Sequence, residues 1–474
     1  MPFPFFRHKQ ADDLILGRLG RFRFSKPCVV KTPARSTHLY VVGKTGKGKS
    51  KFLQSCLYQD VATGRGCGVI DPHSRLIEDL LGQLLASGAL DHPAQASRLV
   101  YVEPTRTDYV VPFNILATPG NPYEVAQGVI EAFHRTWDLA DAPRFDNVLL
   151  HALLLLIQTH LTLIDLPRLL TSRDFRDDLL ERTQDGELRA FFHDRFDQWG
   201  RDTPLMIESV LNKATALTMN PYLKLMLGQP GNHLDFRALM DGGHVLMVDL
   251  GRCRDESQRL IGNLITTGLE QAVFSRADLP AQDIRRFYLY IDEFQDFSAS
   301  DEKALYKILS GARKFGLYLT LAHQNQSQLS ERMRGAIMGN VGLKVIFGIS
   351  ETDALHLAQL VGMGNIDTEA VKHEAPTDSQ HPVFTPLTEQ FYRWAETLAT
   401  QQPRQAILRD HEGNTRPLWV TAVPDSHAPT EALKAASMAA WGIPAAQARQ
   451  NLNRPPLKQP SPAVRPPAYD RIAL

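Results

Sequence analysis

Short apolar runs recur along the chain and alternate with stretches of helical periodicity. Near-continuous apolar runs of this length are typical of strands buried on both faces of a parallel sheet that helices cover. The pattern therefore predicts an α/β fold with a doubly wound, mostly parallel sheet. The runs that predict strands are Leu39–Val42, Gly68–Ile70, Leu99–Val102, Val245–Val248, Tyr288–Ile291, Leu317–Leu321 and Leu343–Phe347.

The stretch 122–240 interrupts this alternation. It contains no clear strand, but it has apolar positions at helical spacing, notably over Asn147–Leu163 and Met206–Met219. A loop of that length without structure of its own is uncommon in a compact domain. We therefore predict an all-helical insertion at 122–240 between the two parts of one core, 37–121 and 241–365.

Three further segments lie outside the core and the insertion. Residues 1–36 form an N-terminal extension, in which Ile15–Val30 could form a small β element. The apolar pattern weakens after about Pro382, so 366–453 is a C-terminal region without an assigned role. The last segment, 454–474, is rich in proline and is expected to be disordered.

The composition is that of an ordinary globular protein, with 43% hydrophobic and 22% charged residues. Lys+Arg and Asp+Glu both number 52. Because the charges balance, no global positive field draws nucleic acid to a single subunit, and any such contact must come from local patches.

The cysteines and the apolar runs indicate the cellular compartment. Cys28, Cys56, Cys67 and Cys253 lie far apart without a CxxC pair, which argues against a zinc site and against a disulfide framework. A reducing cytoplasm is the simplest inference. The longest apolar run, Val148–Ile157, is only about half the length that a bilayer requires, so we expect no membrane span.

The strongest chemical motif is the segment GKTGKGKS, which follows an apolar run and precedes a helical stretch. Its glycines let backbone N–H groups turn toward the phosphates of a nucleotide, Lys49 reaches the β and γ phosphates, and the Ser50 hydroxyl ligates Mg²⁺. The sequence therefore predicts that the chain binds ATP and Mg²⁺. The residues expected at the nucleotide are Gly43, Lys44, Thr45, Gly46, Lys47, Gly48, Lys49, Ser50 and Lys51.

A second motif supplies the acids that such a site needs. The apolar run Phe287–Ile291 ends in Asp292 and Glu293, although buried strands otherwise exclude charge. We expect Asp292 to hold the metal ion. Glu293 would be the general base that polarises the attacking water.

A third apolar run ends in His323 and Gln324. The amide of Gln324 could sense the γ-phosphate, or both residues could merely cap the strand. Arg313, before this run, is a candidate arginine finger that stabilises the charge on a neighbouring subunit's nucleotide. A surface salt bridge is the alternative for Arg313, and Lys314 could take either role in its place.

Each of the other charged positions allows two interpretations of its role. Asp71, at the end of an early strand, either supports the Mg²⁺ site or caps the next helix. The basic turns Gly251–Arg254 and Trp199–Asp202 either contact the phosphates of DNA or are ordinary solvated turns.

The segments HLYVVGKTGKGKS, VIDPHSRL, IDEFQDF and RKFGLYLTLAHQ together resemble the HerA/FtsK branch of P-loop ATPases, closest to the TraG/TraD-type ATPases of conjugative transfer. The resemblance covers about residues 36–362. It implies a RecA-like core, a homohexamer with nucleotide sites between subunits, and DNA threaded through a central pore. The predicted helical insertion matches the all-α lobe of this group.

Two features depart from the family. Many coupling proteins begin with membrane helices, and none is predicted in this sequence. The roughly 35 residues before Leu39 also look too short for the full β-barrel typical of HerA. We therefore expect a cytoplasmic protein that reaches the inner membrane only through partners.

The resemblance leaves three functions to weigh. The leading one is ATP-driven translocation of DNA, with duplex as the expected form and a relaxase or secretion channel as partner. The second is an ATPase assembly platform that regulates a partner nuclease or other effector. The third is an ATPase that packages or secretes protein. Stimulation of hydrolysis by DNA favours the first, and stimulation only by a partner protein favours the second.

Overall fold

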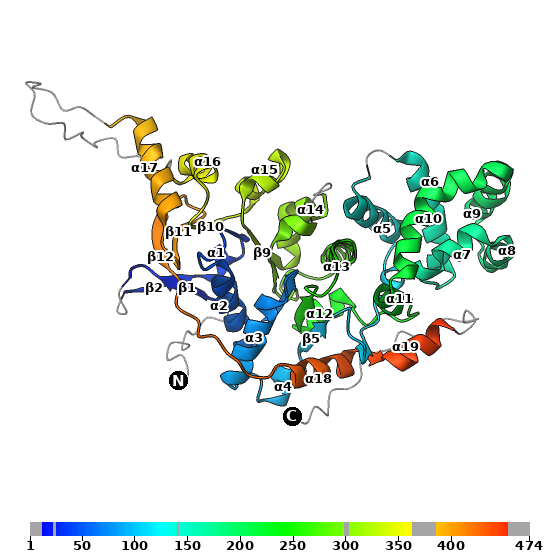
Figure 1. Cartoon of the computed structure of the whole chain (residues 1–474), viewed down its shortest axis with the longest axis horizontal. Helices are drawn as coiled ribbons and strands as arrows, with labels where there is room; N and C mark the ends of the chain where they lie inside the picture. The colour runs from blue at the N-terminus through cyan, green and yellow to red at the C-terminus, as the bar shows by residue number, and fades with distance from the viewer. Residues whose placement is uncertain (1–11, 22–24, 140–141, 298–302, 363–384, 454–474) are drawn as a thin grey trace, which may run out of the picture.

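The computed structural model describes residues 12–21, 25–139, 142–297, 303–362 and 385–453. Figure 1 shows an elongated molecule with a central sheet and a helical lobe at one end. The segment 454–474, for which the sequence predicts disorder, lies outside the described residues.

One sheet of eleven strands forms the centre of the molecule, in the order β2-β1-β12-β11-β10-β3-β9-β8-β4-β7-β5. The strands from β10 to β5 run parallel to one another, and they are the strands that the apolar runs predict. The predicted α/β fold with a mostly parallel sheet is therefore confirmed. These strands are β3 (Leu39–Val42), β4 (Gly66–Asp71), β5 (Leu99–Val102), β7 (Val245–Asp249), β8 (Phe287–Ile291), β9 (Leu317–His323) and β10 (Leu343–Phe347).

Helices cover both faces of the parallel strands. Every residue of these strands is buried, as expected when both faces of a sheet are covered. In Figure 1, α2 and α3 lie on one side of the strands and α13, α14 and α15 on the other. The helices of the core are α1 (Thr32–Arg35), α2 (Lys49–Ala62), α3 (Arg75–Ala86), α4 (Pro93–Ala96), α13 (Asp255–Ser275), α14 (Lys303–Gly311), α15 (Glu331–Asn340) and α16 (Glu351–Gly362).

The sheet extends beyond the predicted core at one side. β1 (Leu14–Arg18) and β2 (Pro27–Val30) form a hairpin in the segment where the sequence suggests a small β element. β11 (Gln405–Arg409) and β12 (Thr415–Trp419) join this hairpin to β10, and all of these pairs are antiparallel. The C-terminal region therefore contributes to the main sheet, which the sequence analysis did not predict.

The described part of 122–240 is helical and contains no strand. Prolines at the first turns of α5, α6, α7, α10 and α11 suit helix starts, because the missing N–H has no helical partner there. This lobe packs on the core through α5 and α13. Its helices are α5 (Pro122–Trp137), α6 (Pro143–Gln158), α7 (Leu166–Thr171), α8 (Arg173–Arg182), α9 (Gly186–Ala190), α10 (Thr203–Met219), α11 (Pro221–Leu227) and α12 (Phe236–Gly242).

After β12, the C-terminal strap, residues 420–453, runs back across the molecule toward the helical lobe (Figure 1). Asp425 pairs with Lys51 of α2 at 2.6 Å. Ser437 donates from Oγ to the carbonyl of Leu99 in β5 at 2.8 Å. The strap thereby connects the core to the lobe, where its last helix packs on α11. Its elements are α18 (Glu431–Trp441), β13 (Ile443–Pro444), which pairs with β6 (Tyr109–Val110), and α19 (Ala445–Leu452); α17 (Leu387–Thr400) precedes β11.

Among the described residues, no helix combines the length and the apolar character that a membrane crossing needs.

Candidate nucleotide-binding site

The glycine-rich loop joins β3 to α2 at the carboxyl end of the parallel strands. Gly46 and Gly48 have φ values of +80° and +109°, a left-handed region that favours glycine. The N–H of Lys44 donates to the carbonyl of Gly348, after β10, at 2.8 Å, which holds the loop against the sheet. Lys44, Thr45 and Gly46 are exposed, so the loop and the first turn of α2 form an open cradle that suits phosphates.

The structure brings the lysine of this loop to both predicted acids. Asp292 and Glu293 directly follow β8, which is separated from β3 by β9. The ammonium of Lys49 forms an ion pair with Glu293 and lies 3.5 Å from Oδ1 of Asp292. All three side chains are buried. Ser50 is exposed beside Lys49, and its hydroxyl together with the Asp292 carboxylate is an oxygen donor set of the kind that Mg²⁺ prefers.

The site shifts the pKa values of the two acids in opposite directions. Burial, together with the negative charge of Glu293, raises the pKa of Asp292 despite the nearby Lys49. Burial also opposes ionisation of Glu293, but the charge of Lys49 and hydrogen bonds from Lys49, Gln295 and Gln324 outweigh it and lower its pKa. Glu293 is therefore ionised at neutral pH, the state that a general base requires. Its backbone is left-handed at φ +43°, which is uncommon for a residue with a side chain.

Gln324 lies between the loop and Glu293. Its Nε2 donates to Oε1 of Glu293 at 2.9 Å, and its Oε1 accepts a hydrogen bond from Oγ1 of Thr45 at 2.9 Å. A residue that only capped β9 would not bridge these two groups. The neighbouring His323 is fully buried, where its ring contacts the hydroxyl of Tyr40, and burial and the charge of Lys49 lower its pKa to about 3. His323 is therefore a neutral residue packed under the site.

Asp71 caps a helix. Its two carboxylate oxygens accept hydrogen bonds from the backbone N–H groups of His73 at 2.8 Å and Ile77 at 3.1 Å, at the start of α3. Burial raises its pKa to about 6, and the charges of Asp292 and Asp249 add to this increase. The sequence left two roles open for Asp71, support of the Mg²⁺ site or capping of the next helix. The hydrogen bonds of the structure show the capping role.

This raised pKa predicts a pH dependence of stability. The folded pKa of Asp71 lies above its ordinary value of 3.8, so ionisation of Asp71 destabilises the fold as pH rises through about 6. At about 1.4 kcal/mol per pKa unit, the loss approaches roughly 3 kcal/mol above pH 7. Asp71→Asn removes the titration, so its free energy of unfolding relative to the wild type should rise between about pH 4 and pH 7. A difference that stays constant across this range in urea titrations would contradict the assignment.

Two predicted residues have side chains that point away from this site. Arg313 donates from Nε to the carbonyl of Ser36 at 3.0 Å and lies just before β9, at the amino end of the strands. It therefore does not reach the nucleotide cradle of its own chain. The ammonium of Lys51 pairs with Asp79 at 2.8 Å and with Asp425 at 2.6 Å, so any contact of Lys51 with a nucleotide would come from its backbone.

The two basic turns have ordinary local roles in the described structure. Arg252 pairs with the buried Glu103 at 3.0 Å, at the end of β5. Residues Trp199–Asp202 lie in the segment Asp197–Asp202, where two 3₁₀ turns meet at a kink at Gly200. Neither observation tests a contact with DNA.

A second wall of the site, which the sequence does not predict, comes from the C-terminal region. Arg404 donates its backbone N–H to the carbonyl of Lys47 at 2.8 Å, and Lys47 donates from Nζ to the carbonyl of Gln401 at 2.7 Å. A Cβ at Gly48 would lie 3.3 Å from the Arg404 backbone. Arg404 is exposed and has a left-handed φ of +67°. Because Arg404 lies far from the loop in the sequence, no local pattern predicts this contact.

We expect Arg404 to strengthen nucleotide binding. Arg404→Gly removes the guanidinium and keeps the left-handed backbone, because glycine adopts positive φ without strain. Loss of one charge-assisted hydrogen bond to phosphate should lower the affinity for a fluorescent ADP analogue about tenfold. Arg393→Ala, at an exposed position of α17, is the matched control and should bind normally. If the affinity of Arg404→Gly is unchanged, the guanidinium does not bind the nucleotide, and Arg404 contributes only its backbone contact with the loop.

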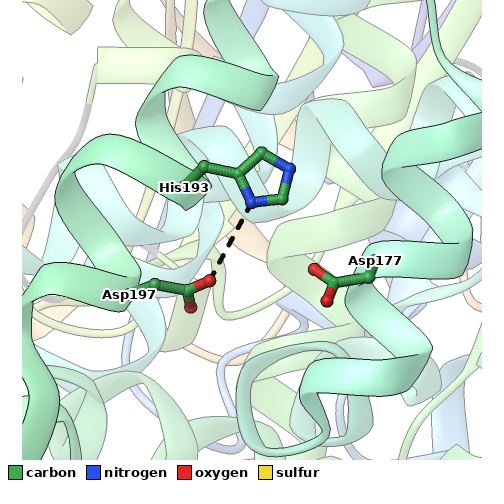
Figure 2. A group of neighbouring side chains, drawn as sticks. All are labelled: Asp177, His193 and Asp197. Carbon is green, nitrogen blue, oxygen red and sulfur yellow. Dashed lines mark ion pairs between the residues drawn. The ribbon is translucent and has the colours of Figure 1, made fainter.

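The helical lobe contains the one group of possible metal ligands found among the described residues, Asp177, His193 and Asp197 (Figure 2). Arg176 already pairs with Asp197 at 2.6 Å. Arg173 lies 3.6 Å from Asp177 and 3.7 Å from Asp197. Since these guanidinium groups supply the positive charge that the carboxylates need, the group is an ion-pair cluster of the lobe and not part of the nucleotide site.

The sheet and the glycine-rich loop together define a RecA-like fold of the P-loop class. Residues 238–390 match the family model described as the type IV secretion-system coupling protein DNA-binding domain. Comparison of the sequence with curated proteins finds no match. The family match covers β7 to β10 and the start of α17.

Solved structures of a conjugative coupling protein and of VirB4 share the fold. The conjugative coupling protein TrwBdeltaN70 superposes with a TM-score of 0.60 at 16% identity over 85% of this chain and 88% of that chain. TrwB in complex with ADP and Mg²⁺ gives 0.57 at 15% identity over 84% and 89%. VirB4 of Thermoanaerobacter pseudethanolicus gives 0.56 at 16% identity over 87% and 96%. At this identity the solved structures show a shared fold, and the family match at residues 238–390 agrees with the resemblance to type IV coupling proteins.

Proposed function

We propose that the chain hydrolyses ATP and uses the energy to move DNA, as a homohexameric ring that serves DNA transfer. The observation that carries the proposal is the connected set of Lys49, Glu293 and Gln324 at the open glycine-rich loop. A lysine for phosphates, an ionised acid and an amide that touches both the acid and the loop are the parts that phosphoryl transfer needs. TrwB, which shares the fold, has been solved with ADP and Mg²⁺.

Each residue of this set would have a separate role. The loop N–H groups and Lys49 would hold the β and γ phosphates, and Ser50 and Asp292 would hold Mg²⁺, which neutralises phosphate charge. Glu293 would accept a proton from the attacking water. Gln324 contacts both Glu293 and Thr45, so it is placed to link the position of the base to the presence of the γ-phosphate.

The location of Arg313 supports an assembly of several copies. The glycine-rich loop lies at the carboxyl end of the parallel strands, and Arg313 lies at their amino end. Head-to-tail contacts between identical subunits close into rings when the rotation permits. In such a ring the amino end of one sheet would face the nucleotide of the next subunit, and Arg313 would stabilise the charge on the transferred phosphoryl group.

The DNA part of the proposal is supported by the match of residues 238–390 to a family model named for a DNA-binding domain. The test is the ATP turnover of the full chain, at a measured oligomeric mass, with duplex DNA, with single-stranded DNA and without DNA. A motor predicts a ring and faster turnover with one of the two DNA forms. Turnover that only a partner protein raises would favour the assembly platform, and no ATP turnover under any condition would refute the proposal.

A further inference from the structure

A basic pocket lies at the amino end of the sheet, opposite the glycine-rich loop. It has a volume of about 490 Å³ and is lined by the residues that precede β4, β8 and β9. The acids Asp292 and Glu293 follow the carboxyl end of β8, whereas Arg285 and Arg286 precede its amino end. The charged lining residues of this amino-end pocket are Asp12, Arg65, Arg285, Arg286, Arg313 and Lys314.

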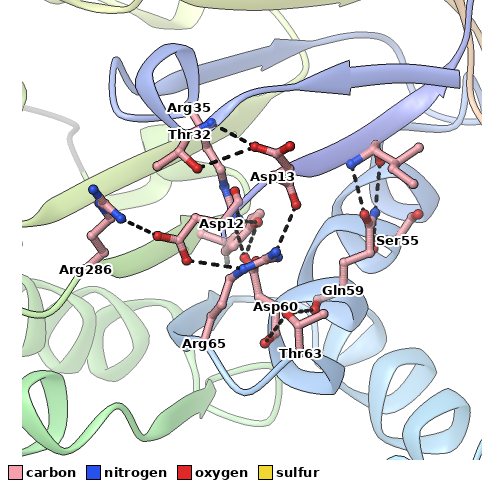
Figure 3. A network of polar contacts seen from close by, with 12 residues as sticks. Asp12, Asp13, Thr32, Arg35, Ser55, Gln59, Asp60, Thr63, Arg65 and Arg286 are labelled. Atoms are coloured by element: carbon pink, nitrogen blue, oxygen red, sulfur yellow. Dashed lines mark hydrogen bonds and ion pairs between the residues drawn. The ribbon is translucent and has the colours of Figure 1, made fainter. Parts of the chain in front are cut away.

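Some of these charges are already neutralised. Asp12, the one acid among the described lining residues, lies 2.5 Å from Arg286 and 3.5 Å from Arg65 (Figure 3). Arg65 also pairs with the buried Asp60 at 3.0 Å. Figure 3 shows this network fastening the N-terminal extension to α2. Arg65 and Arg286 are therefore structural cations, although they line the pocket.

The remaining cations, Arg285, Arg313 and Lys314, have no acidic partner among the described residues. Arg285 donates from Nη1 to the carbonyl of Gly242 at 3.0 Å, and Arg313 donates from Nε to the carbonyl of Ser36 at 3.0 Å. A carbonyl anchors a guanidinium group without cancelling its charge, so several N–H donors of each arginine remain available. Arg285, Arg313 and Lys314 are exposed, and none of them forms an ion pair within the described part of the chain.

The shape of the pocket decides between possible anions. Its volume falls in the range of roughly 300–1,000 Å³ that is typical of small-molecule sites. A duplex distributes its phosphates along a cylinder, at about one charge per 1.7 Å of axis, so a pocket of this volume holds only a short part of that path. A polyphosphate chain concentrates several negative charges in a small volume, and guanidinium groups bind phosphate with paired hydrogen bonds.

We propose that the amino-end pocket binds the phosphate groups of a compact polyphosphate, such as a nucleoside triphosphate, with Arg285, Arg313 and Lys314 as its ligands. The polyphosphate comes either from a free nucleotide or from the nucleotide held by an adjacent copy. The second source rests on the proposed ring. In both cases Arg313 does not bind phosphate alone. Arg285 and Lys314 bind it together with Arg313 in one pocket.

The first measurement is calorimetric titration of the full chain with tripolyphosphate. The Lys49→Ala background disables the glycine-rich loop, so the remaining binding reports the amino-end pocket. Adding Arg285→Ala and Lys314→Ala should then weaken it at least about tenfold, since each lost charge-assisted contact alone is worth about that factor. Adding Arg393→Ala instead should change nothing. Thermal unfolding of every variant shows whether it is folded.

The second measurement separates the two sources of phosphate. Arg285→Ala/Lys314→Ala, which keeps the glycine-rich loop, is mixed with Lys49→Ala, which keeps the pocket. Recovery of ATP turnover in the mixture identifies the nucleotide of the adjacent copy, and binding of tripolyphosphate to Lys49→Ala identifies a free nucleotide. If neither occurs, or if duplex DNA displaces tripolyphosphate from the pocket, the inference is wrong. Tripolyphosphate binding by a chain that fails to hydrolyse ATP would refute the proposed function and leave the pocket assignment intact.

Discussion

Lys49→Ala is expected to abolish nucleotide binding. In the structure Lys49 is the first residue of α2 after the glycine-rich loop, and it lies within reach of both acids that follow β8. Removing it takes away the charge that holds the β and γ phosphates, and it leaves two buried carboxylates to repel them. Because a charged hydrogen bond contributes about 1.5–3 kcal/mol and the repulsion adds to that loss, affinity for ATP should fall at least about 100-fold.

The same substitution should destabilise the protein. Breaking a buried ion pair by removing one partner costs about 3–5 kcal/mol, and Lys49, Asp292 and Glu293 are all buried. Thermal unfolding must therefore accompany the binding measurement. Lys224→Ala, an exposed lysine on α11, is the matched control and should keep both stability and affinity. Normal ATP binding by folded Lys49→Ala would exclude the loop as the nucleotide site.

Glu293→Gln is expected to bind ATP and to stop turning it over. Glutamine keeps the size of the side chain and can still bond to Gln324, but it cannot take a proton from water. Loss of a general base slows such reactions by about 100- to 10,000-fold. Affinity for ATP should remain, because the repulsion between Glu293 and the phosphates is also removed. The variant should therefore accumulate in a nucleotide-loaded form.

Turnover and bound nucleotide are measured together on Glu293→Gln. Glu103→Gln provides the matched control, because Glu103 is a buried acid at the carboxyl end of β5 that bonds to Tyr101 and Arg252 and not to Lys49. Its turnover should stay close to that of the wild type. If Glu293→Gln hydrolyses ATP at the normal rate, Glu293 is not the base.

The parallel part of the fold could be predicted because its signal is local. Strands such as β3 and β8 are buried on both faces, so they appear in the sequence as unbroken apolar runs. The loop after β3 and the acids after β8 occupy the carboxyl ends of such runs, where a parallel sheet collects its polar residues. The encounter of Lys49 with Glu293 follows from that topology.

The antiparallel strands could not be predicted in the same way. β12 has exposed positions and contains Pro417, a residue confined to edges and bulges of sheets, so its sequence has no continuous apolar run. Its place in the sheet comes from pairing with β11 and β1. The contact of Arg404 with the glycine-rich loop depends on the same long-range pairing.

The position of Arg313 needed the structure for a different reason. The sequence places it before β9 and suggests an arginine finger, but one chain cannot reveal whether a residue acts in a neighbour. The structure places it at the opposite end of the strands from Lys49, together with Arg285 and Lys314 in one pocket. The domain boundaries predicted from the sequence, with the core ending near residue 365, remain predictions.

The central claim is that one nucleotide and one metal ion join the glycine-rich loop to the acids after β8. The most direct measurement is a crystal structure of Glu293→Gln with ATP and Mn²⁺, in which anomalous scattering locates the metal. The account predicts a metal ion bound by the Ser50 hydroxyl and the nucleotide phosphates, with the Asp292 carboxylate at the metal or at one of its waters. A metal or nucleotide found elsewhere, or Ser50 and Asp292 too far apart to share one ion, would contradict it.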